Sequence, residues 1–447
     1  MLKEASKAQD ERDSVLVLTN DLFTPASKTS RFISLALRRL GIRNWVRDTS
    51  DIRYLFSLLE EHQLTKHIGA SEMIHVDRFQ SLVNLAEIKT ILSLDLHWFF
   101  TPEPFVSMEN VDKIISLWFD DLRTACTTSQ SIKPADRSFQ ETLTHPKVHH
   151  MFYGNAQMDE AKELGITNRY HSPLAAPQEY LSSDSPLKYR GRLAFVGNPG
   201  IPSPPSAEAL KLLHKKADLT ELRKASIQEI ESQQAYHHFN STHRDIPKLI
   251  SRALECKLAH PHKSSLSLLC EVGKEYPEAL EALNNSRNIL EAAILVKCVN
   301  RYDRPAIVFR LYQQDKVDVF SAPWEWKPYG IQAKPLVRFH DLPQTYRSYV
   351  AQLNGANPAR DATANEKLFE IAACGRASIN ISSPDILECF EHKKEFLSYK
   401  SLEEIEENAL YYLKNPDELL QIGENARARV AKQHTWDHRL QTILEKF

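Results

Sequence analysis

The stretch from Ala364 to Asp385, ANEKLFEIAACGRASINISSPD, places a carboxylate near the start of an expected helix. Asn365 is a residue type that caps helix N-termini, and Gly375 is typical of a helix end. The free backbone N–H groups and the dipole of a helix N-terminus both favour anions. Glu370, one turn inside this helix, could accept hydrogen bonds from two ribose hydroxyl groups. An ordinary helix–strand unit with Glu370 as a surface charge explains the same pattern.

The elements that would position this stretch follow an α/β pattern from the beginning of the chain. Residues 15–18 form a buried strand, and a polar loop and a helix ending at Gly41 follow it. This succession is typical of a doubly wound sheet, where ligands bind beyond the carboxyl ends of the strands. We therefore expect an α/β domain over residues 14–175, after a polar lead at 1–13. Its further strands are expected at residues 88–94, 111–118, 148–152 and 170–174.

A second domain is expected over residues 191–435, after a polar linker rich in proline and serine at 176–190. Its first strand covers residues 192–198. Amphipathic segments without strand signals fill about 206–300 and predict a helical insertion. The final helix, 436–447, is expected to pack back on the N-terminal domain. The later strands are expected at 306–311 or 317–320, and at 336–339 and 350–353.

The composition excludes several classes of function. A net charge of −2 argues against a general nucleic-acid binder, and no apolar run reaches the length of a membrane span. The N-terminal residues lack the apolar core of a signal peptide, and the six cysteines form no close pair. A reduced, cytoplasmic setting is therefore expected, with peripheral membrane contact left open. No glycine-rich phosphate loop occurs, so helix ends and side chains would have to hold any nucleotide.

The C-terminal third resembles the CgeB-like glycosyltransferases. The motifs that carry the resemblance are NEKLFEIAACG (365–375), SPDILECFEHKKEFLSYKSLEEI (383–405), YYLKNPDE (411–418) and ARARVAKQHTWDHRL (426–440). The resemblance implies the GT-B architecture, with two Rossmann-like domains and a C-terminal domain of the glycosyl transferases group 1 type. It also implies sugar transfer from a nucleotide-diphosphate sugar to a glycan, protein or other hydroxyl acceptor.

Donor-binding roles follow from the resemblance by position. Glu370 takes the role of the ribose-binding carboxylate, and Asn365 with the following backbone amides faces the diphosphate. Lys367 stands where the family usually has arginine, which keeps the charge but loses the bidentate fork. Trp324 could stack on a base or a sugar ring, although packing explains it equally well. The basic residue that the family often has after the first strand of this domain is not evident, and Arg310, Arg338 and Arg360 are alternatives for it. The full set of expected donor-binding residues is Glu370, Asn365, Lys367, Thr363, Arg310 and Trp324.

Glycosyl transfer further requires stabilisation of the leaving diphosphate and, for inversion, a base. The architecture implied by the resemblance favours a metal-independent reaction without a cofactor. His97, Asp120 and Asp121 follow expected strands and are the candidate bases, although His97 could pack beside aromatic residues and the aspartates could cap a helix. Two other readings stay open: a non-catalytic sugar-nucleotide binder or scaffold in surface-glycan assembly, and an enzyme of the same fold with different chemistry, such as an epimerase.

Overall fold

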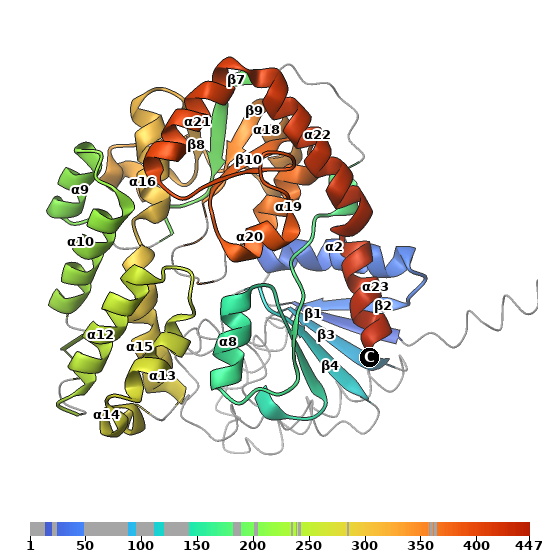
Figure 1. Cartoon of the computed structure of the whole chain (residues 1–447). Helices are drawn as coiled ribbons and strands as arrows, with labels where there is room; N and C mark the ends of the chain where they lie inside the picture. Colours follow the sequence, from blue (N-terminus) through green and yellow to red (C-terminus); the bar gives the residue numbers. More distant parts are fainter. Residues whose placement is uncertain are drawn as a thin grey trace, which may run out of the picture. The chain divides into compact units, whose positions relative to one another are not determined.

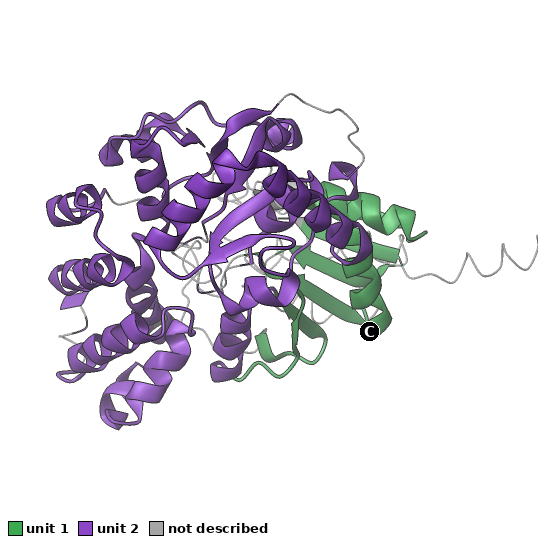
Figure 2. Cartoon of the chain, turned by 45° about the horizontal axis from the view of Figure 1, so that its top comes forward, with its two compact units in different colours: residues 1–152, 165–172, 436–447 green, residues 153–164, 173–435 purple. Residues whose placement is uncertain are grey.

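The computed structural model divides the chain into two compact units. Unit 1 comprises residues 1–152, 165–172 and 436–447, and unit 2 comprises residues 153–164 and 173–435 (Figure 2). The structure describes residues 14–19, 25–48, 88–94, 111–119, 143–181, 189–200, 204–233, 236–237, 239, 243–283, 286–355, 357, 361 and 364–447. Within these ranges, no helix is both long and apolar enough to cross a membrane.

Unit 1 is built on a parallel six-stranded sheet with the order β2-β1-β3-β4-β5-β6. The sheet is doubly wound because β1 lies between β2 and β3. Four of its strands match the expected apolar runs closely, whereas β2 was not expected from the sequence. The strands are β1 (Ser14–Thr19), β2 (Asn44–Asp48), β3 (Ile88–Leu94), β4 (Lys113–Leu117), β5 (Val148–Phe152) and β6 (Arg169–His171).

The last helix of the chain, α23 (Trp436–Lys446), belongs to unit 1 and packs against α2 (Pro25–Arg39). Arg39 and Asp437 form a two-pronged ion pair at 2.6 and 2.8 Å. The ring of Trp436 lies 5.9 Å from that of Phe119, measured between centroids. The buried residues of α23 are Trp436, Leu440 and Ile443.

Unit 2 contains a parallel five-stranded sheet with the order β11-β10-β9-β7-β8 (Figure 1). Its first strand, β7, lies between β8 and β9, so the winding direction reverses at β7. The two doubly wound sheets confirm the predicted α/β fold with two Rossmann-like parts. The strands are β7 (Arg190–Val196), β8 (Val317–Phe320), β9 (Tyr349–Leu353), β10 (Ala377–Ile381) and β11 (Leu397–Tyr399).

The helices that accompany this sheet follow its strands or lead into them. α19 packs against the long α22, and α16 packs against α21. Short helical segments lie at Gln178–Tyr180 (η2), Lys327–Tyr329 (η5) and Phe339–Asp341 (η6). The helices are α16 (Asp303–Gln313), α17 (Pro323–Trp326), α18 (Leu342–Arg347), α19 (Glu366–Ala373), α20 (Pro384–Cys389), α21 (Leu402–Lys414) and α22 (Pro416–Gln433).

The segment expected to be a helical insertion is helical where it is described, and we call residues 207–300 the helical block. Its helices lie beside one another at the side of unit 2, and α8 (Asn155–Glu163) packs on α13 (Figure 1). The members of the block are α9 (Ala207–His214), α10 (Leu219–Ser232), α12 (Ile246–Ala259), α13 (Ser265–Gly273), α14 (Pro277–Ala282), α15 (Ser286–Lys297) and η4 (Cys298–Asn300).

Two strand expectations fail in unit 2. Residues 306–311, one of two alternatives for a strand, lie inside α16, and the strand is the other alternative, at 317–320. Every one of the residues 306–311 is buried, so this helix has no polar face and its apolar run does not distinguish helix from strand. Residues 336–339 are not a strand either, because residues 335–338 have no regular structure and η6 begins at Phe339.

Candidate anion-binding site

The carboxyl ends of β7 and β9 meet at the point where the unit 2 sheet reverses its winding. The chain leaves β7 through Gly197 and Asn198, and it leaves β9 through Asn354 and Gly355. Ligands of doubly wound sheets bind at such a switch point, outside the carboxyl ends of the strands. Helix α19 follows β9, so its N-terminus lies at this edge together with its free backbone N–H groups.

Arg304 joins the two loops at the switch point. It is the second residue of α16, and 6% of its surface is exposed. Its Nε donates to the Gly355 carbonyl at 3.2 Å, and one terminal nitrogen donates to the carbonyl and side-chain oxygens of Asn198 at 3.1 and 3.2 Å. Burial lowers the pKa of Arg304 to about 10, so the guanidinium remains charged at neutral pH. A buried cation therefore links the loops that leave β7 and β9.

Lys367 brings a second cation to the same edge. It is the second residue of α19, and its Nζ donates to the Val196 carbonyl at 2.7 Å. Gly197 has a φ of +149°, and a Cβ atom there would lie 2.9 Å from the Lys367 Nζ. The indole N–H of the buried Trp326 donates to the Gly197 carbonyl at 2.8 Å. Glycine at this position thus allows both the turn and the close approach of the lysine.

Asn365 is the N-cap of α19, as the sequence predicts. Its side-chain oxygen accepts from the Leu368 backbone N–H at 3.2 Å. Its amide nitrogen donates to Asn354 at 3.4 Å, and Asn354 donates to Asn380 at 2.9 Å. This chain of amides crosses the ends of β9 and β10 and fixes the position from which α19 starts.

We call the N-terminus of α19 together with Arg304 and Lys367 the anion site. A helix N-terminus favours negative charge, and guanidinium and ammonium groups form strong, charge-assisted hydrogen bonds to phosphate. Arginine adds a planar fork that matches two phosphate oxygens, whereas lysine acts as a point charge. The arrangement therefore gathers the kinds of group that bind a diphosphate in proteins.

Glu370 lies one turn further along α19, inside the protein. Only 6% of its surface is exposed, and its carboxylate accepts a hydrogen bond from the buried Tyr346 hydroxyl at 3.3 Å. Burial, and then the charge of Glu370, raise the pKa of Tyr346 far above its ordinary value. The same two causes raise the pKa of Tyr180. A ribose would compete with Tyr346 for this carboxylate, and the ribose-binding role of Glu370 stays a prediction.

Arg310 does not join the anion site. It lies in the last turn of α16, about 9 Å from Arg304 along the helix axis. Its guanidinium donates to the carbonyls of Lys216 and Ala217 at 2.6 and 2.9 Å. It also forms ion pairs with Glu403 at 2.7 Å and with Glu406 at 3.4 Å. The arginine expected to bind the donor thus serves as a structural link between helices.

The remaining predicted residues are an exposed tryptophan and four residues that the structure does not describe. Trp324 lies on α17, after the carboxyl end of β8, with 74% of its surface exposed. Thr363, His97, Asp120 and Asp121 lie outside the described residues. The expected roles of these residues stay predictions.

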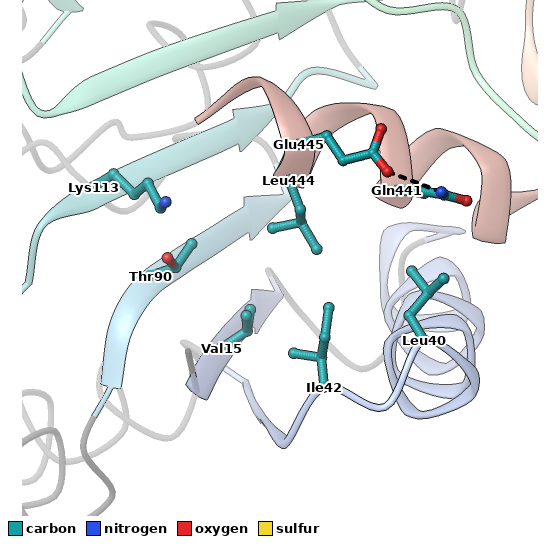
Figure 3. A pocket seen from close by; sticks show the side chains of 8 residues that line it. All are labelled: Val15, Leu40, Ile42, Thr90, Lys113, Gln441, Leu444 and Glu445. Atoms are coloured by element: carbon teal, nitrogen blue, oxygen red, sulfur yellow. Dashed lines mark hydrogen bonds between the residues drawn. The ribbon is translucent and has the colours of Figure 1, made fainter. Parts of the chain in front are cut away.

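A cavity of about 480 Å³ in unit 1 lies at the amino ends of the strands of its sheet (Figure 3). Thr90, Lys113 and Val15 come from the beginnings of three strands, and Leu444 comes from α23. The candidate bases, by contrast, follow the carboxyl ends of β3 and β4 in sequence. The cavity is thus separate from the edge where the sequence predicts chemistry.

The sequence prediction missed Arg304 and Asn354. Asp303-Arg304-Pro305 carries a usable signal, because an acidic residue and a proline in the first turn are typical of a helix start. Treating 306–311 as a candidate strand concealed that start. For Asn354 there is no local signal, since its role depends on Asn365 and Asn380 reaching it in space.

One family model and several solved structures are similar to the chain. No curated protein matches it. A glycosyltransferase from Rickettsia africae ESF-5 is 10% identical, covers 97% of both chains and has a TM-score of 0.48. Sucrose-phosphate synthase from Thermosynechococcus elongatus is 10% identical over 97% of this chain and 98% of its own, with a TM-score of 0.49. HepE from Anabaena, in complex with UDP-glucose, is 11% identical over 97% and 98%, with a TM-score of 0.46.

The family match covers the part of the chain that forms the anion site. Both cations and the whole of α19 lie within the matched residues. Residues 294–445 match the model of a family described as glycosyl transferase-like.

Proposed function

We propose that the protein is a CgeB-like glycosyltransferase that moves a sugar from a nucleotide-diphosphate sugar to a hydroxyl group of an acceptor. The observation that carries the proposal is the meeting of Arg304, Lys367 and the N-terminus of α19 at the switch point of unit 2. The family match over residues 294–445 supports it. Two Rossmann-like units are also the components of the GT-B architecture that the resemblance implies.

In the proposed reaction, the anion site binds the leaving group. Cleavage of the bond between the sugar and the diphosphate leaves negative charge on the phosphate oxygens. Preorganised donors aimed at developing charge are a major source of catalysis. Here Arg304, Lys367 and the amides of α19 supply the positive charge, so the proposed reaction needs no metal. His97, Asp120 and Asp121 remain the proposed bases for the acceptor hydroxyl.

Binding of the donor requires the two cations to change partners. The contacts of Arg304 include the Gly355 carbonyl and two oxygens of Asn198, and those of Lys367 include the Val196 carbonyl. In these contacts only the donor is charged, whereas a phosphate oxygen would add a full negative charge on the acceptor side. The diphosphate would therefore displace the carbonyls of Gly355 and Val196 from these side chains.

Titration calorimetry with UDP, GDP and their sugar conjugates tests the proposal. We expect Arg304→Met to weaken binding by about a hundredfold and Lys367→Met by about tenfold, as the loss of one charge-assisted contact implies. Arg252→Met is the matched control, because Arg252 is exposed on α12 and pairs with Glu255. Wild-type protein that binds none of these nucleotides, or an Arg304→Met variant that binds normally, would contradict the proposal.

A sugar-nucleotide-binding protein without transferase activity is the second candidate. Lys367 favours it, because a lysine where the family usually has arginine lacks the bidentate fork that would stabilise the leaving diphosphate. Release of nucleoside diphosphate from a donor sugar distinguishes the two functions. Binding without release, in the presence of varied hydroxyl acceptors, would support the second candidate.

A further inference from the structure

A buried ion pair joins the helical block to the segment that leads into α19. Lys257 of α12 is fully buried, and its Nζ lies 2.7 Å from the carboxylate of Asp361. The other oxygen of Asp361 accepts from the Ser265 backbone N–H at 2.8 Å, at the first turn of α13. The Ser265 hydroxyl donates to the first oxygen at 3.1 Å. Asp361 is thus held by two helices of the block.

The position of Asp361 in the sequence connects this pair to the anion site. Asp361 comes four residues before Asn365, the N-cap of α19, and six residues before Lys367. The amides of Asn354 and Asn365 hold the start of α19 from the side of the sheet. Asp361 adds a contact with the helical block four residues before this N-cap.

A second ion pair connects the block to the other half of the anion site. The guanidinium of Arg223, on α10, donates two hydrogen bonds to the Asp303 carboxylate, at 3.1 and 2.6 Å. Asp303 is the residue directly before Arg304. Figure 1 shows α10 and α12 on the same side of unit 2 as the N-terminal part of α16. Each half of the anion site thus has one ion pair with the block beside it.

Buried ion pairs are weak sources of stability, because the cost of removing two charges from water offsets their attraction. Burial lowers the pKa of Lys257, and Asp361 opposes this shift. Burial acts to raise the pKa of Asp361, but Lys257 and Lys297 together bring it below its ordinary value. Asp361 is therefore ionised at neutral pH. Its contacts with Lys257 and Ser265 have a defined geometry.

We propose that the helical block is a positioning element for the anion site, with Asp361 and Lys257 as its positioning residues. The block fixes the approach to α19 through Asp361 and the start of α16 through Asp303. The identity of the bound anion as a nucleoside diphosphate rests on the proposed function. The positioning itself can be measured without any ligand.

Amide hydrogen exchange tests the positioning in the unliganded protein. Asp361→Asn removes the charge and keeps the size of the side chain, so we expect at least tenfold faster exchange at residues 368–371, whose amides are hydrogen-bonded in the first turns of α19. Asp318→Asn is the matched control, since Asp318 pairs with Lys334 at 2.5 Å and lies near the amino end of β8, away from the approach to α19. The control should leave residues 368–371 unchanged. Equal exchange of these amides in wild type and Asp361→Asn would overturn the proposal.

Binding of UDP, measured by calorimetry, separates positioning from general stability. Asp361→Asn and Lys257→Met should each bind UDP at least tenfold more weakly than Asp318→Asn does. The double variant Lys257→Met/Asp361→Asn removes both charges, so its urea midpoint should recover towards that of the wild type while UDP binding stays weak. Affinity that recovers together with the midpoint would show a structural role only and overturn the proposal.

The outcomes distinguish this proposal from the proposed function. If wild-type protein binds no nucleoside diphosphate, the proposed function fails, and the exchange experiment still decides whether the block positions α19. If Arg304→Met loses UDP binding and Asp361→Asn does not, the anion site stands and the positioning role of the block fails.

Discussion

At the scale of single residues, Gly355 determines whether Arg304 can lie across the switch point. A Cβ atom on Gly355 would meet the Arg304 Cγ at 2.8 Å and its Cβ at 3.3 Å. Gly355→Ala should therefore displace the arginine and weaken UDP binding by about tenfold, because overpacking of this kind costs about 1–3 kcal/mol. Titration calorimetry measures the change. Gly191→Ala, where a Cβ atom meets nothing within 4 Å, should bind normally; equal affinity of the two variants would contradict the expectation.

His150 in unit 1 gives a prediction about pH. Its Nδ1 accepts from the Trp118 indole N–H at 3.0 Å, which leaves the ring proton on Nε2, 2.9 Å from the Leu143 carbonyl. Burial lowers the pKa of His150 to about 4. The unfolded chain, with an ordinary pKa near 6.5, therefore takes up the proton first as the pH falls. This histidine should lower the free energy of unfolding by about 3 kcal/mol between pH 6.5 and pH 4.

Urea unfolding at several pH values, followed by tryptophan fluorescence, measures this effect. His150→Gln lowers stability at every pH but removes the titrating group, so its unfolding free energy should fall less steeply below pH 6.5. Parallel curves for the variant and the wild type would show that His150 is not the group responsible.

The sequence predicted the role of a single residue correctly where that role depends only on its neighbours in the chain. Asn365 caps α19 because its own side chain reaches a backbone N–H three residues later, a property of the sequence alone. Arg310 and Arg304 show the limit. They lie on one helix, six residues apart, and only the fold decides that one meets carbonyls at the switch point and the other meets carboxylates.

At the scale of elements, the sequence was informative wherever a helix or strand has one buried face or a clear end. Helix α19 begins after Asn365 and ends before Gly375, as expected from the cap and glycine signals. Residues 306–311 of helix α16 are all buried, so this segment has no exposed face and no hydrophobic periodicity that would indicate a helix. Its starting signal at Asp303 and Pro305 was more informative than its apolar core.

The strand β2 escaped prediction for a different reason. Its sequence, NWVRD, has two central apolar residues between polar ones, too short a run to indicate a strand alone. Pairing with β1 over its whole length defines it instead. Edge strands of this kind are specified by their neighbours more than by their own composition.

At the scale of the whole molecule, unit 1 is assembled from the two ends of the chain. Helix α23 follows the unit 2 helices in sequence but packs on α2, with Leu440 fully buried. Leu440→Ala should destabilise unit 1 by about 2–5 kcal/mol through the lost contacts and the cavity left behind. Hydrogen exchange should therefore speed up in strands β1, β3 and β4 while β9 and β10 stay protected.

Leu336→Ala, at a leucine of unit 2 with 66% of its surface exposed, is the control and should change neither sheet. Equal loss of protection in both sheets of the Leu440→Ala variant would mean that the two units unfold together, and the division of the chain into separately stable parts would be wrong.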